Sequence, residues 1–116
     1  MWNRERFQEL VADAVDAMPE WVRRSLDNVE ILVDDEPPLG ESTNTMGLYV
    51  GIPLTKRGSD YSGVQPDTIT LFAGPIGREA RGTGRTVAEV VARTLRHEIA
   101  HHFGIDDERL LEIDAY

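Results

Sequence analysis

The chain has 116 residues, of which 41% are hydrophobic and 28% are charged, and this predicts one compact domain spanning residues 1–116. Lys plus Arg is 12 and Asp plus Glu is 21, so the net charge is −9, which disfavours nucleic acid and anionic membrane surfaces as partners. The absence of cysteine excludes disulfides, thiol catalysis and cysteine-based metal sites.

The N-terminal part of the sequence predicts two helices and a strand. Apolar residues recur at helical spacing from Phe7 to Met18, and Asn3 stands in the N-cap position. Pro19 begins a short helical segment that ends near Leu26, and residues 29–33 alternate as a strand does. Because the first residues lead into an amphipathic stretch, we expect neither a signal peptide nor a transmembrane span, and a cytoplasmic location.

Loops and two further strands are predicted in the middle of the chain. Residues 34–46 contain two prolines and several turn residues, and residues 56–66 form a second predicted loop. Residues 47–50 are a short strand candidate. The clearest strand lies at residues 68–72, because β-branched and aromatic side chains are concentrated there and Gly74-Pro75 bounds it.

The strongest helix signal lies near the C-terminus. Thr86 and Glu89 have the spacing of a capping box, and Gly104 stands where a left-handed residue often ends a helix. A helix is therefore predicted from about Val87 to Phe103, followed by a short terminal helix within residues 105–116. The order of elements predicts an α+β fold, with helices packed on a small mixed or antiparallel sheet.

The three histidines of the chain all lie within residues 97–102 of this predicted helix. His97 and His101 are four positions apart, so their side chains share one helix face and both can reach one zinc ion. Glu98 lies one step round the helix, where it can accept a proton from a water that the metal activates. His102 falls on the apolar arc and is predicted to be a hydrogen-bonded core residue.

A zinc site of this kind needs a third protein ligand. Gly104 can adopt the positive φ that ends the helix and turns the chain back toward the ion. Asp107 follows that turn, and aspartate is an acceptable zinc ligand. Asp106, Glu108 and Glu112 are alternative ligands from the same segment.

The pattern His-Glu-x-x-His-x-x-Gly-x-x-Asp resembles that of the small bacterial zincin-like metallopeptidases. The resemblance implies a minimal α+β zincin fold whose metal-binding helix lies near the C-terminus. It also implies zinc bound by His97, His101 and Asp107, with Glu98 as the general base. Further segments that carry the resemblance are residues 48–55, 66–75 and 107–110.

The expected function is that of a zinc-dependent peptidase that hydrolyses peptide bonds with Glu98 as the base. The alternative is a zinc-containing module that binds a peptide or protein without cleaving it. An unligated Glu98 favours the peptidase, because a structural zinc site is usually closed by a fourth protein ligand.

The predicted partner is a peptide or protein substrate. In zincin-like folds an edge strand before the metal helix pairs with an extended peptide, and the strand from Thr68 to Phe72 is the candidate for that role. A donor besides zinc would also be needed for the tetrahedral intermediate, and Tyr49, Tyr61 and Tyr116 are candidates.

Overall fold

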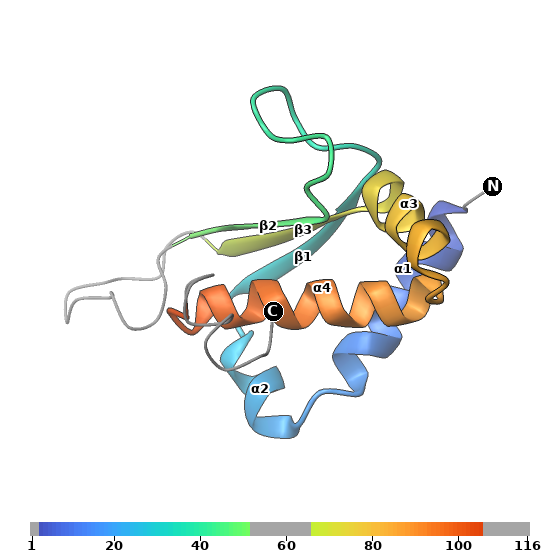
Figure 1. Cartoon of the computed structure of the whole chain (residues 1–116). Helices are drawn as coiled ribbons and strands as arrows, with labels where there is room; N and C mark the ends of the chain where they lie inside the picture. Colours follow the sequence, from blue (N-terminus) through green and yellow to red (C-terminus); the bar gives the residue numbers. More distant parts are fainter. Residues whose placement is uncertain (1–2, 52–65, 106–116) are drawn as a thin grey trace.

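A computed structural model of the chain describes residues 3–51 and 66–105. Within these residues a three-stranded sheet packs against helices, and Figure 1 shows α4 running along one face of the sheet. This is the predicted α+β class. In chain order the elements are α1 (Arg4–Asp16), α2 (Glu20–Ser25), β1 (Val29–Asp34), β2 (Gly47–Val50), β3 (Asp67–Phe72), α3 (Ala73–Thr83) and α4 (Val87–His102).

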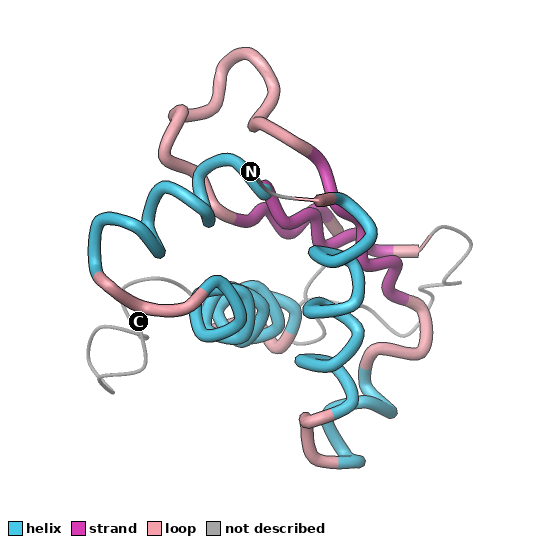
Figure 2. Tube along the Cα trace, turned by 90° about the vertical axis from the view of Figure 1, so that its right-hand side faces the viewer, coloured by secondary structure: helices cyan, strands magenta, loops and turns pink. Residues whose placement is uncertain are grey.

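The sheet is mixed, with strand order β1-β3-β2. β1 runs parallel to β3, so that Ile31 pairs with Ile69, and β2 runs antiparallel to β3, so that Tyr49 also pairs with Ile69. Figure 2, which looks along α4, shows the strands lying to one side of that helix. Helix α4 therefore packs against the face of the sheet that carries Ile69.

The predicted edge position of the strand from Thr68 to Phe72 is wrong. β3 is the central strand, since β1 pairs with it on one side and β2 on the other. Its backbone groups are used by these two neighbours, so an extended peptide has no open side of β3 to join. Among the described strands, β1 and β2 form the edges.

The core lies between β3 and α4. Ile69 and Leu71 of β3 are fully buried, as are Val91 and Leu95 of α4. Burying an aliphatic side chain of this size contributes about 1.5–3 kcal/mol, so this contact is a main source of stability for α4. Phe7 and Val11 of α1, together with other buried side chains, extend the same cluster.

Helix α3 was not predicted from the sequence, because Gly74-Pro75 is typical of a turn. The structure places Pro75 at the third helical position, where a backbone N–H would have no partner within the helix anyway. Ile76 and Ala80 recur at helical spacing and are buried. Gly84 ends the helix with a φ of 74°.

The other helix predictions are confirmed where the structure describes them. Asn3 caps α1 by accepting a hydrogen bond from the backbone N–H of Arg6 at 3.1 Å. The predicted loop at residues 56–66 and the predicted terminal helix within residues 105–116 lie almost wholly outside the described residues. Across residues 3–51 and 66–105, no helix combines the length and the apolar character that a bilayer crossing requires.

Candidate metal centre

Helix α4 carries the candidate site, and both of its ends are well defined. Thr86 and Glu89 form the predicted capping box at its start. At its end the Ile105 N–H donates to the Ala100 carbonyl and the Gly104 N–H donates to the His101 carbonyl, each at 2.9 Å. These two bonds form a Schellman motif, with Gly104 at a φ of 85°. The helix therefore ends directly after its histidines, as the position of Gly104 in the sequence predicts.

His97 and His101 point their imidazoles toward one position. Their Nε2 atoms lie 3.2 Å apart and their ring centroids 4.8 Å apart. Two nitrogens bound at 2.0–2.1 Å to a tetrahedral zinc would lie about 3.3 Å apart, which matches the arrangement present here. The helix thus holds two imidazoles at the separation that one zinc ion requires.

Glu98 completes a cluster of potential ligand atoms with these histidines. Ligand atoms of His97, Glu98 and His101 all lie within 4.8 Å of one another. The Oε2 atom of Glu98 is 4.0 Å from His97 Nε2, and the Glu98 side chain is only 9% exposed. Its carboxylate therefore lies beside the position that an ion bound by both imidazoles would occupy, and the Glu98 side chain is buried more deeply than that of His97.

Two adjacent stripes of α4 explain why these side chains differ in burial. Thr94, Glu98 and His102 recur every four residues and form the stripe that lies under the sheet, where all three are buried. His97 and His101 belong to the neighbouring stripe and are half-buried. The strand β2 thus covers the glutamate, while the two imidazoles face outward beside it.

A cleft of about 580 Å³ opens beside the stripe of α4 that carries His97 and His101. Its walls come from α4, from β2, from the loop that precedes β2, and from Glu79 of α3 and Arg85 just after that helix. The cluster of His97, Glu98 and His101 therefore lies at a site that a ligand can reach. The α4 side chains that line the cleft are Val90, Arg93, Thr94, His97, Glu98 and His101.

His102 is a buried core histidine, as predicted. It is 1% exposed, and its Nε2 donates to the Ser25 carbonyl of α2 at 2.9 Å. Its Nδ1 lies 3.3 Å from Asp67 Oδ2 and 3.3 Å from the hydroxyl oxygen of Tyr49. These contacts tie the last turn of α4 to α2, β2 and β3, and so hold the neighbouring His101 in place.

The Tyr49 hydroxyl belongs to this network. It donates to Asp67 Oδ2 at 2.7 Å, and Asp67 is only 3% exposed. The proton of this hydroxyl is therefore engaged by Asp67, while the Tyr49 side chain also lines the cleft. The other two tyrosine candidates, Tyr61 and Tyr116, lie outside the described residues.

The site residues predicted from the sequence divide into two groups. His97, Glu98 and His101 come together on one turn of α4. Sequence reasoning did not find the partners of His102, because Tyr49 and Asp67 are distant in the chain and only the sheet register brings them together. The proposed third ligand and its alternatives lie outside the described residues, and they are Asp107, Asp106, Glu108 and Glu112.

Comparison with known proteins agrees with this geometry. Residues 26–116 match the family described as zincin-like metallopeptidase. A solved structure of a conserved hypothetical protein from Thermus thermophilus is similar, with 25% identity, a TM-score of 0.60, and coverage of 88% of this chain and 94% of that chain. No curated protein sequence matches the chain significantly.

Proposed function

The chain belongs to the zincin-like metallopeptidase family, and from this premise we propose that it is a zinc-dependent peptidase. The observation that carries the proposal is the pair of Nε2 atoms of His97 and His101, 3.2 Å apart at the floor of an open cleft. A buried carboxylate, that of Glu98, lies beside them. This combination of two imidazoles, one neighbouring glutamate and an open cleft is what metal-assisted hydrolysis requires.

We propose His97, His101 and Asp107 as the zinc ligands. The two histidines fit a tetrahedral ion by their separation. Asp107 is proposed from its position three residues after Gly104, whose left-handed conformation turns the chain away from the helix axis. Three protein ligands leave the fourth position of the ion open for water and substrate.

When bound, zinc polarises the scissile carbonyl and lowers the pKa of a water molecule at the site. Glu98 then acts as the general base, since its carboxylate oxygen lies within reach of the position between the two imidazoles. It accepts the proton from the attacking water and passes it to the leaving amine. Burial beneath β2 restricts the glutamate to this one position, which favours proton transfer at a fixed atom.

The strand β2, rather than β3, is the place where we propose that a peptide binds. The Phe72 N–H donates to the Met46 carbonyl at 2.9 Å, which marks a hydrogen-bonded pair next to β2. Because such pairs alternate along an antiparallel ladder, the N–H and C=O of Gly47 point away from β3. A peptide that joins this edge would lie along the cleft and next to Glu98.

A quenched-fluorescent peptide library tests the proposal. The zinc-loaded protein is expected to cleave members of the library, to lose that activity after chelation and to recover it when zinc is restored. If the zinc-loaded protein binds peptides but cleaves none above the rate of the chelated protein, it is instead a binding module. Zinc content must be measured in each sample, so that a missing ion is not mistaken for a missing activity.

A further inference from the structure

The loop between β1 and β2 forms one wall of the cleft. It spans residues 35–46 and rises beyond the sheet in Figure 1. Asn44, Thr45 and Met46, at its end, line the cleft together with β2. A peptide bound on the β2 edge would therefore contact both this loop and the cluster of His97, Glu98 and His101.

Side-chain burial contributes little to holding this loop in position. From residue 35 to residue 44 every residue is exposed except Pro37, which is half-buried, and Leu39 near the tip is fully exposed. A segment of this kind has no apolar core of its own to fix its conformation. Its position must therefore depend on polar contacts at its base.

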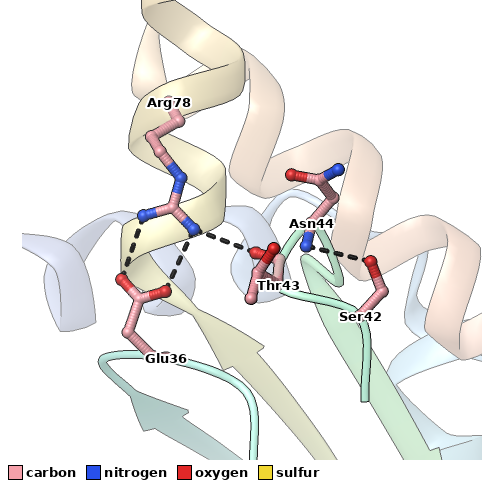
Figure 3. A network of polar contacts seen from close by, with 5 residues as sticks. All are labelled: Glu36, Ser42, Thr43, Asn44 and Arg78. Carbon is pink, nitrogen blue, oxygen red and sulfur yellow. Dashed lines mark hydrogen bonds and ion pairs between the residues drawn. The ribbon is translucent and has the colours of Figure 1, made fainter.

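Arg78 of α3 supplies those contacts, as Figure 3 shows. Its guanidinium donates to both carboxylate oxygens of Glu36, at 3.1 and 3.0 Å, and to the carbonyl oxygen of Thr43 at 2.9 Å. Glu36 lies near the start of the loop and Thr43 near its end. One side chain therefore holds both ends of the loop together, and we call this arrangement the Arg78 clamp.

The surroundings of Glu36 support the clamp. The Gly74 N–H, at the start of α3, donates to the Asp35 carbonyl at 2.8 Å, and a side chain at Gly74 would collide with the Glu36 carboxylate. The hydrogen bond from Arg78 also holds the pKa of Glu36 below its ordinary value. Exposed ion pairs usually contribute little, but bidentate arginine–carboxylate geometry is the exception.

We propose that Arg78 is a positioning residue that fixes the Asn44–Met46 wall of the cleft and so determines how tightly a peptide substrate binds. The proposal rests on the proposed peptidase function. Arg78 does not itself line the cleft, so it acts through the loop that it holds. His97, Glu98 and His101 are held by α4 and not by this loop, so the clamp should affect substrate binding and not the chemical step.

The test compares Arg78→Ala with Arg81→Ala, using the best substrate from the peptide library. Arg81 lies on the same helix, later in the chain, and is exposed and outside the cleft lining, which makes it a matched control. For Arg78→Ala we expect KM to rise roughly two- to tenfold. Without the clamp the Asn44–Met46 wall is disordered in the free protein, and part of the binding free energy of the peptide is then spent on ordering it. We expect kcat and zinc affinity to stay unchanged, and Arg81→Ala to match wild type.

Two further readouts do not depend on peptide cleavage or on the alanine variant alone. Backbone amide exchange in residues 39–46 should accelerate in Arg78→Ala and not in Arg81→Ala. Arg78→Lys should resemble Arg78→Ala, since a single ammonium cannot reproduce the planar contact with both Glu36 oxygens and the Thr43 carbonyl.

The proposal is overturned if Arg78→Ala and Arg81→Ala have the same KM and the same loop exchange. It is also overturned if Arg78→Ala lowers kcat with KM unchanged, since Arg78 would then act on the chemical step. If the wild-type protein cleaves no peptide, the peptidase proposal fails separately. The exchange measurement then decides by itself whether Arg78 fixes the wall.

Discussion

Gly47 of β2 lies so close to Glu98 of α4 that a Cβ built on the glycine would be 2.9 Å from Glu98 Cγ and 3.2 Å from its Oε2. The same Cβ would be 2.9 Å from Thr94 Cγ2. The edge strand can therefore cover the proposed catalytic base only because residue 47 has no side chain. The contact between Gly47 and Glu98 therefore affects both the packing of β2 on α4 and the position of the proposed base.

Gly47→Ala is expected to move Glu98 and so lower the rate of peptide hydrolysis with zinc still bound. The added methyl should cost about 1–3 kcal/mol of stability, as overpacking usually does. Steady-state kinetics, zinc content and thermal melting measure the three effects. The control is Gly82→Ala on α3, where a Cβ meets no atom within 4 Å, and a small gain in stability is expected from better helix propensity. Equal rates in the two variants would contradict the proposed role of the contact.

Much of the candidate metal centre could be predicted because its residues are close together in the sequence. His97, Glu98 and His101 lie on a single helix turn, and the capping box and Gly104 define that helix from nearby residues alone. No distant contact was needed to place these three side chains together.

The sheet order could not be predicted in the same way. The β-branched and aromatic side chains of residues 68–72 identify a strand but do not say which strands lie beside it, and an interior strand and an edge strand have similar compositions. Helix α3 was missed for a related reason, since Gly74-Pro75 suits both a turn and a first helical turn. The buried contact between Asp67 and His102 joins residues far apart in sequence, and only folding reveals it.

Asp107→Ala and Asp106→Ala should separate the third ligand from its neighbour. Asp107→Ala is expected to reduce zinc affinity sharply and abolish hydrolysis, because a ligand is lost. Asp106→Ala is expected to leave zinc bound and to cost about 1 kcal/mol of stability if that residue caps a following helix. Zinc content and affinity of both variants are the measurement. The reverse ranking would transfer the ligand role to Asp106.

Zinc should raise the melting temperature in a concentration-dependent way. Binding to the folded state alone stabilises it by about 2.7 kcal/mol at a free zinc concentration 100 times Kd, or roughly 10 °C for a chain of this size. Calorimetry across a zinc series measures the effect, with His97→Ala as the control that should lack it. If the melting temperature of the wild type did not change with zinc concentration, the folded state would not bind zinc more tightly than the unfolded state does.

The Arg78 clamp should weaken under acid. Because the hydrogen bond from Arg78 lowers the pKa of Glu36, the clamp stabilises the folded loop above the ordinary pKa and is lost as pH falls through the lowered value. Carbon NMR of the Glu36 carboxyl group should therefore give a lower midpoint in the wild type than in Arg78→Ala. Identical midpoints would show that the two side chains do not interact in solution.

The most direct test of the zinc peptidase account is the rate of zinc-replete Glu98→Gln. Glutamine keeps the size of the side chain but cannot accept the proton, so the fold and zinc content should be retained. The rate should fall by at least about 100-fold, the usual contribution of a positioned general base. Hydrolysis by Glu98→Gln at a rate close to wild type, with zinc measured in both proteins, would contradict the account.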